Sequence, residues 1–227
     1  MRNGKIVFTE CTLFDGHNFN SAPDNVVIVD GDRIIDVSAG TYPEKAGEHA
    51  INLGGKTLMP GLIDAHFHCN SPSLDVASID GLFPSHLAQY ARTYLEETLN
   101  RGFTTVRDAG GADKGLVDAI DTGLIKGPRL FISGKALSQT GGHGDMRKPE
   151  PFDVCGCQYK GALTSVVDGV DSVRKVVRTE LHNGAHQIKI FVSGGVLSPT
   201  DPIWMNQFTD EEIRAAVDEA ASPRTDV

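Results

Sequence analysis

The alternation of short apolar runs with helical segments after Pro60 constrains the fold of this 227-residue chain more than any other feature. Four runs have the length and composition of buried strands: "LIDAHFH" (62–68), "FTTVRDAG" (103–110), "RLFISG" (129–134) and "QIKIFVSGG" (187–195). A helical pattern follows each run, at about 85–102, 112–123, 165–184 and 209–220. This order predicts a parallel sheet with right-handed crossovers, either doubly wound or the first half of a (β/α)8 barrel.

Residues at the ends of the helical segments agree with these boundaries. Thr209 is suited to an N-terminal cap, and Glu212 three residues later completes a capping box. Gly102, Gly123 and Gly184 lie where helices commonly end in a left-handed residue.

The first 59 residues follow a different pattern, in which short alternating runs are broken by turn residues. The stretch "VVIVDGDRIIDV" (26–37) predicts two strands joined by a hairpin at Asp30-Gly31-Asp32. The region is too short for a large core, so we expect a small sheet that packs against something else.

Composition and charge exclude several classes of function. Apolar residues make up 40% and charged residues 22% of the chain, as in soluble globular proteins. The formal net charge of −9 would repel nucleic acid and an anionic membrane surface, so neither is an expected partner. The N-terminus lacks the apolar core of a signal peptide, which predicts a cytoplasmic protein. We expect the four cysteines (Cys11, Cys69, Cys155 and Cys157) to be free thiols, and the Cys155/Cys157 pair to be a weak metal candidate.

The lengths of the connections predict where a site would lie. The connections that follow the strands are long (69–84, 135–163 and 194–208), whereas those from helix to strand are short (101–102 and 183–186). Long loops at the carboxyl ends of parallel strands are where α/β folds build their sites. A nucleotide site would need a glycine-rich loop after the first strand, and "HCNSPSLDV" (68–76) is not one.

Two histidines end the first of these strands. Side chains two residues apart share one face of a strand, so His66 and His68 are expected to lie side by side. Neutral imidazoles in this arrangement suit a divalent metal such as zinc. Spacing alone is equally compatible with two ordinary histidines. The preceding Pro-Gly turn and the loop-bearing strand end favour the metal.

The segment "LMPGLIDAHFHCN" (58–70) resembles the first-strand signature of the metal-dependent amidohydrolase superfamily. In that family a small β-sandwich precedes a (β/α)8 barrel, and the His-x-His pair binds one or two divalent metals. The lead-in "INLGGKTLMPG" (51–61) is similar too, so the resemblance covers essentially the whole chain. It implies that residues 1–59 are part of a composite β-sandwich domain and that 60–227 form an incomplete metal-dependent hydrolase barrel of about four βα units.

Lys189 is the only charge in an otherwise apolar strand, where a buried ammonium group is costly. It either reaches the strand end, pairs with a carboxylate or is modified. The segment "IKIFVSGGVLSP" (188–199) resembles the fourth strand of the imidazolonepropionase-like and metal-dependent peptidase-like branch. In that branch the lysine is carboxylated by carbon dioxide and bridges two metals. The resemblance therefore implies that His66, His68 and a carbamate on Lys189 are the metal ligands. Zinc, manganese and iron are all compatible with these ligands.

Other candidate residues carry weaker signals. His143 lies in a glycine-rich loop and resembles the position from which related enzymes reach the substrate or a metal-bound oxygen, although an ordinary loop histidine fits nearly as well. Arg107 and Asp108 end the second strand, where they would support the metal ligands or form a local ion pair. We expect His182 and His186 to be structural, and Trp204 to wall a substrate pocket or cover the rim of the barrel.

The resemblance implies hydrolysis of a C–N bond in an amide, cyclic amide or dipeptide-like small molecule. The family's later histidine ligands and its catalytic aspartate would lie beyond Val227, and no fifth strand is predicted after 209–220. The chain therefore resembles an N-terminal half. The alternative to an enzyme is a non-catalytic metal-binding fragment that needs a complementary half. An open sheet edge predicts self-association or a homo-oligomer.

Overall fold

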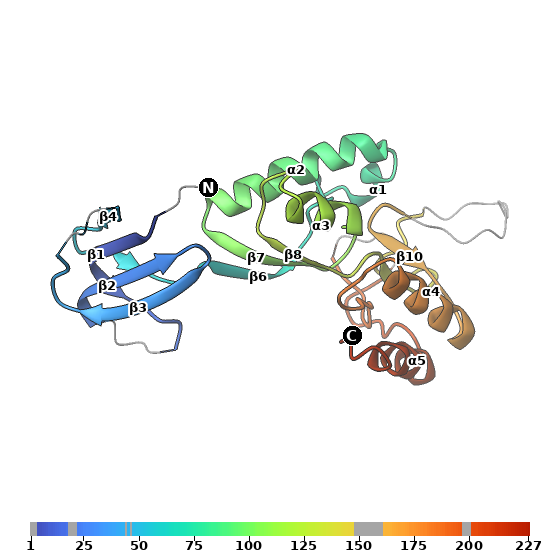
Figure 1. The fold of residues 1–227 in the computed structure, drawn as a ribbon. Coiled ribbons are helices and arrows are strands. Elements are labelled where there is room, and N and C mark those ends of the chain that lie inside the picture. The colour runs from blue at the N-terminus through green and yellow to red at the C-terminus, as the bar shows by residue number, and fades with distance from the viewer. Residues whose placement is uncertain (1–3, 18–21, 44, 46, 148–160, 197–200) are drawn as a thin grey trace. The chain divides into compact units, whose positions relative to one another are not determined.

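The structure is a computed structural model that describes residues 4–17, 22–43, 45, 47–147, 161–196 and 201–227 (Figure 1). The chain divides into two compact units, residues 1–61 and 62–227, which are described separately. Among the described residues, no helix is both long enough and apolar enough to cross a membrane.

The first unit is a five-stranded sheet in which β3, β2, β1 and β4 are neighbours in that order, and β5 pairs with β1. Its strands are β1 (Ile6–Leu13), β2 (Ala22–Asp30), β3 (Arg33–Ala39), β4 (His49–Asn52) and β5 (Thr57–Leu58). The predicted hairpin is confirmed, because Asp30 pairs with Arg33 in an antiparallel register across a two-residue loop. Gly31 in that loop has φ +61°, a conformation that favours glycine.

The core of this sheet is small. Val7, Val26 and Ile28 are buried, and Tyr42 packs against them. Every residue of β3 is exposed, including Ile34 and Val37. The composite sandwich stays a prediction.

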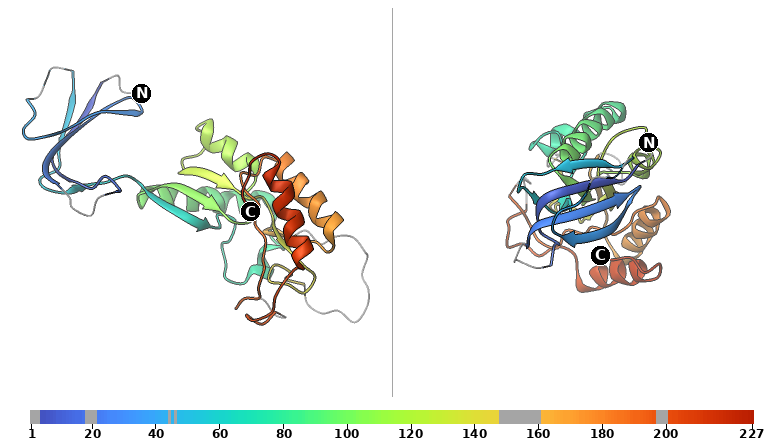
Figure 2. Two further views of the ribbon diagram at one scale, coloured as in Figure 1. Left: turned by 90° about the horizontal axis from the view of Figure 1, so that it is seen from below. Right: turned by 60° about the vertical axis from the view of Figure 1, so that its left-hand side comes forward.

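The second unit contains a parallel sheet in the order β6 (Leu62–Phe67), β7 (Phe103–Asp108) and β8 (Arg129–Ile132). The helices in chain order are α1 (Val76–Ile79), α2 (Pro84–Asn100), α3 (Lys114–Asp121), α4 (Val170–His182) and α5 (Asp210–Ala221). Helices α2 and α3 cover one face of the sheet, and α4 and α5 lie side by side (Figures 1 and 2). These βα units are the predicted part of a (β/α)8 barrel.

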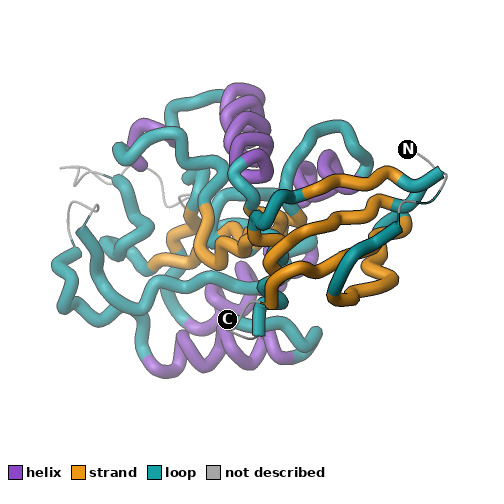
Figure 3. Tube along the Cα trace, turned by 90° about the vertical axis from the view of Figure 1, so that its left-hand side faces the viewer, coloured by secondary structure: helices purple, strands orange, loops and turns teal. Residues whose placement is uncertain are grey.

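The two largest apolar clusters of this unit involve different helices. One cluster lies between the β6–β8 sheet and the helices α2 and α3. Its buried side chains are Cys69, Ala91, Leu95, Val106, Ala112, Leu130 and Ile132. A second cluster joins α4 and α5, and it includes Leu137, Val173, Val177, Ile188 and Ala216. Figure 3 shows helices on the outside of the strands, as expected when each helix buries one apolar stripe.

The fourth predicted strand, 187–195, is an extended segment rather than a regular strand. It is held by isolated bridges, Gln187 to Asp226, Ile190 to Leu137 and Ser193 to Asn206. Its partner at Leu137 belongs to β9 (Ala136–Ser138), which pairs in parallel with β10 (Thr164–Val166). The sequence did not predict β9 and β10.

The largest difference from a predicted boundary lies at the start of α4. The helix expected from residue 165 begins at Val170, because residues 164–166 pair with β9 and Gly169 has φ +82°. After α5, Asp226 forms an isolated parallel bridge with Gln187, and the described residues contain no further strand. The capping box of Thr209 and Glu212 is confirmed at α5. The predicted ends at Gly102, Gly123 and Gly184 all have positive φ.

Candidate metal centre

His66 and His68 lie at the carboxyl end of β6, and their ring centroids are 5.3 Å apart. The two rings meet edge to face at 60°. The Asp64 carboxylate accepts a hydrogen bond of 3.0 Å from the His66 backbone N–H. The β6–β7 register shifts between Asp64 and Phe67, so the ladder is interrupted at the histidines. Their side chains nevertheless stay close, as the two-residue spacing predicts.

A buried carboxylate fixes the backbone that follows His68. Asp108 at the end of β7 is fully buried and accepts three backbone hydrogen bonds, from Cys69 (2.7 Å), Gly110 (3.0 Å) and Ala112 (3.2 Å). Burial raises the pKa of Asp108, while these hydrogen bonds act in the opposite direction. The carboxylate thus ties the residue after His68 to the neighbouring strand.

The same turn orients the His68 ring. The Nδ1 atom of His68 lies 3.2 Å from the carbonyl oxygen of Gly110, and Gly110 is itself held by Asp108. A carbonyl oxygen only accepts hydrogen bonds, so this contact places the proton on Nδ1. The lone pair of the neutral ring is then on Nε2, which is the nitrogen available to a metal.

Lys189 lies near these histidines, half-buried in the extended 187–193 segment. Burial lowers the pKa of Lys189, and the positive charge of Arg107 lowers it further. Burial is also the main cause that lowers the pKa of His66, followed by the charges of Lys189, His68 and Arg107. The cluster therefore favours a neutral imidazole at His66, the form in which histidine binds metals.

The Phe191 ring lies near both Lys189 and His143, which places His143 at the same end of the unit as Lys189. The Lys189 Nζ atom lies 5.1 Å from the centroid of the Phe191 ring, and the His143 ring centroid also lies 5.1 Å from it. The Nδ1 atom of His143 lies 3.3 Å from the Oδ2 atom of Asp201.

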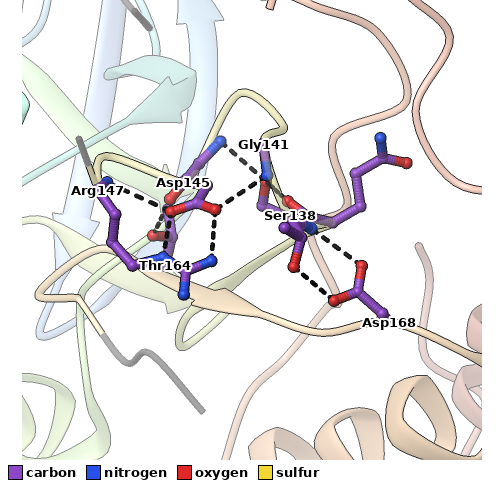
Figure 4. A network of polar contacts seen from close by, with 9 residues as sticks. Ser138, Gly141, Asp145, Arg147, Thr164 and Asp168 are labelled. Atoms are coloured by element: carbon purple, nitrogen blue, oxygen red, sulfur yellow. Dashed lines mark hydrogen bonds and ion pairs between the residues drawn. The ribbon is translucent and has the colours of Figure 1, made fainter. Parts of the chain in front are cut away.

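Side-chain hydrogen bonds hold the loop that carries His143, as Figure 4 shows. The Asp145 carboxylate accepts from the Gly141 N–H (2.9 Å) and from Arg147 (2.6 and 2.7 Å). Asp168 accepts from the backbone N–H and the hydroxyl of Thr140. The glycine-rich composition of this loop reflects close packing. A Cβ on Gly144 would lie 2.8 Å from the Thr164 methyl group.

The donor set fits a divalent metal on chemical grounds. In the described part of the chain, no group of three or more His, Cys, Asp or Glu side chains is placed to hold an ion. The candidate set instead joins two imidazoles to a lysine. An ammonium group cannot bind a cation, whereas a carbamate, if formed on Lys189, would be an anionic oxygen ligand beside two neutral nitrogens.

Other predicted residues have different roles from those expected. Arg107 donates a hydrogen bond of 2.8 Å to the Ala65 carbonyl, and among the described residues no ion pair joins it to Asp108. The ion-pair prediction is therefore wrong, because neighbouring residues of a strand point to opposite faces. His186 Nδ1 accepts from the Ile132 N–H at 3.1 Å, a structural contact as expected.

The remaining candidate residues are Trp204, His182 and the cysteines. Trp204 is 82% exposed, and His182 is exposed at the end of α4. Cys11 and Cys69 are free and buried, whereas Cys155 and Cys157 lie outside the described residues. Two buried polar residues of this end, Asp201 and Gln207, were not predicted. Their only sequence signal is a position in the long loop after the fourth strand.

Comparisons with known proteins agree with the resemblance. The family model described as "Amidohydrolase family" matches residues 57–225. The ochratoxinase of Aspergillus niger is 37% identical over 176 residues, which are 72% of this chain and 37% of that protein.

Two solved structures extend the match. A prolidase crystallised with N-methylphosphonate-L-proline is 43% identical with a TM-score of 0.90, over 97% of this chain and 54% of that one. A Xaa-Pro dipeptidase with methionine bound in the active site is 30% identical with a TM-score of 0.84, over 98% and 55%. The chain thus spans about half the length of these structures.

Proposed function

The chain belongs to the amidohydrolase family, and from that premise we propose that it serves the hydrolysis of a C–N bond with the help of a divalent metal. The observation that carries this proposal is the pair of imidazoles at the end of β6, 5.3 Å apart, with a carbonyl that orients one of them. Asp108 supports this arrangement, because its carboxylate accepts hydrogen bonds from the backbone N–H groups of Cys69 and Gly110.

We assign the metal ligands to His66, His68 and Lys189, with zinc as the expected ion and one or two ions bound. Bound there, the ion would lower the pKa of a water molecule and polarise the carbonyl of the scissile bond. His66 and His68 bind as neutral imidazoles through their lone pairs. The neutral Lys189 amine attacks carbon dioxide, forms an N–C bond and loses one proton, which leaves an anionic carbamate.

The substrate is expected to be a small amide, cyclic amide or dipeptide-like molecule. Two similar structures are a prolidase and a Xaa-Pro dipeptidase, and the similar Aspergillus niger protein is an ochratoxinase. Phe191 offers an apolar ring that lies near both Lys189 and His143, which suits the apolar part of such a substrate. We place His143 at the substrate side of the site.

An assay of hydrolysis tests the proposal. The chain, loaded with zinc or manganese, is offered a panel of Xaa-Pro dipeptides, N-acyl amino acids and cyclic amides. We expect turnover that a chelator and the His66→Ala/His68→Ala variant both abolish. The variant His86→Ala/His182→Ala, which removes two exposed histidines of α2 and α4, is the matched control and should retain it. Turnover that survives in the first variant would contradict the ligand assignment. A metal-loaded chain without turnover would favour the metal-binding module.

A further inference from the structure

Asp201 is the most deeply buried carboxylate near the candidate site that the chemistry above does not use. Its side chain has no exposed surface. Its Oδ2 atom accepts hydrogen bonds from the Gly195 N–H (3.0 Å) and the Gln207 side-chain amide (3.1 Å), and lies 3.3 Å from His143 Nδ1. Its Oδ1 atom is buried and has no hydrogen-bond partner in the described part of the chain.

Gln207 holds His143 from a second direction. This side chain is 1% exposed, and its Oε1 atom accepts a hydrogen bond of 2.9 Å from the His143 backbone N–H. Its amide nitrogen donates to Asp201 at the same time. The segment that carries Asp201 and Gln207 therefore contacts both the backbone and the ring of His143.

The ring is also confined by packing. A Cβ on Gly195 would lie 1.9 Å from the His143 Cε1 atom and 2.2 Å from its Nδ1 atom, so the ring lies directly against the glycine backbone. The Phe191 ring meets the His143 ring edge to face, at 80°. Hydrogen bonds and contacts thus define both the place and the rotation of the imidazole.

We propose that Asp201 is a positioning residue that keeps the His143 proton on Nδ1 and holds the ring beside Phe191 and Lys189, where it meets the substrate. A carboxylate oxygen only accepts, so its contact with Nδ1 selects the tautomer with the proton on that nitrogen. Nε2 is then the nitrogen that carries the lone pair in the neutral ring. The contact with substrate rests on the proposed function, whereas the orientation of the ring does not.

A purely structural role explains the arrangement less well. A buried carboxylate is costly, and one with an oxygen that lacks a partner is more so. An uncharged side chain would close the same loop at lower cost, as replacements of buried charges by apolar residues show in other proteins. The charge is therefore better explained by its effect on the histidine, as in sites where a buried carboxylate orients an imidazole.

The side-chain nitrogen signals of His143 in 15N-labelled protein test this inference without any assay of activity. The signals are assigned by their loss in His143→Gln. We expect a single tautomer protonated on Nδ1 in the parent chain. In Asp201→Ala the two tautomers should mix, and in Asp201→Asn the Nδ1 signal should shift while the fold is kept. Signals that coincide with the parent in both variants would overturn the proposal.

The matched control is Asp168→Asn. Asp168 holds Thr140 in the same loop, and its hydrogen bonds in the described part of the chain go to Thr140 rather than to the His143 ring. The control should leave the His143 signals in place. If it moves them as much as Asp201→Asn does, the role of Asp201 is loop integrity and the proposal is wrong.

Kinetics supply the second arm. In a preparation that hydrolyses a substrate, Asp201→Asn should lower kcat roughly 10- to 100-fold with little change in KM, since orientation of a reacting group is lost. Unchanged kcat beside altered signals would overturn the substrate contact of His143. If the metal-loaded parent shows no hydrolysis, the proposed function fails, and the tautomer measurement still decides whether Asp201 positions the ring.

Discussion

Replacement of Asp108 by asparagine, compared with a control that only weakens the fold, would show whether Asp108 supports metal binding. The carboxylate accepts from Cys69 with one oxygen, and from Gly110 and Ala112 with the other. An asparagine side chain keeps one acceptor oxygen and puts an NH2 group in place of the second. The new NH2 group then faces a backbone N–H, and two donors cannot form a hydrogen bond. The backbone beside His68 therefore loses part of its hydrogen bonding to residue 108.

The size of the effect follows from the bonds involved. A hydrogen bond to a charged group contributes about 1.5–3 kcal/mol, and an unsatisfied buried donor costs about 1–3 kcal/mol. The substitution also removes a buried charge, whose cost is visible in the raised pKa of Asp108. We therefore expect a net loss of about 1–3 kcal/mol in the free energy of unfolding. Zinc affinity should fall roughly 10- to 100-fold, the usual effect when the support of a metal ligand is lost.

Zinc affinity is measured by competition with a chromogenic chelator, and stability by urea unfolding followed by circular dichroism. Val106→Ala is the matched control, because Val106 lies on the same strand, is fully buried and packs in the apolar cluster under the sheet. It should lose about 1.5–3 kcal/mol of stability and keep its zinc affinity. Unchanged affinity in Asp108→Asn, or an equal fall in the control, would refute the reasoning.

Three further predictions concern the rest of the second unit. Thr209→Ala removes the cap of α5, which Glu212 completes, and should lower the free energy of unfolding by about 1 kcal/mol in urea unfolding. Gly195→Ala should displace the His143 ring, and a shift of its nitrogen signals would show this. Hydrogen bonds from Arg147 and backbone N–H groups lower the pKa of Asp145 despite its burial. The stability advantage of the parent over Asp145→Asn should therefore be full above the ordinary aspartate pKa and vanish as pH falls through the lower folded value. Urea midpoints measured in steps from pH 7 down through the acid range test it, and an advantage that does not shrink as the pH falls below the ordinary aspartate pKa would contradict it.

The strand residues show what periodicity could predict. The two-residue spacing of His66 and His68 requires only that β6 be a strand, and the rings do lie close together. The βα units were visible because α2 and α3 carry apolar residues that pack on the sheet, and α4 and α5 carry apolar residues that pack on each other. By contrast, β9 and β10 have three residues each, too few for a period of two to be recognised.

The polar partners of the site were hidden for a different reason. Asp108 was assigned to an ion pair or to metal support, yet its partners are backbone N–H groups, which no sequence pattern marks. Asp201 and Gln207 are buried only because the loop after the 187–193 segment folds against the His143 loop. Both residues contact His143, which lies more than 50 positions away in the sequence, so composition and local pattern do not reveal these contacts.

The most direct test of the metal centre is the metal content of the purified chain by elemental analysis, measured beside His66→Ala/His68→Ala and the control His86→Ala/His182→Ala. We predict stoichiometric zinc or another divalent metal in the parent and the control, and its loss in the first variant. A folded parent without metal above background, or a first variant that retains it, would contradict the assignment of His66 and His68 as ligands.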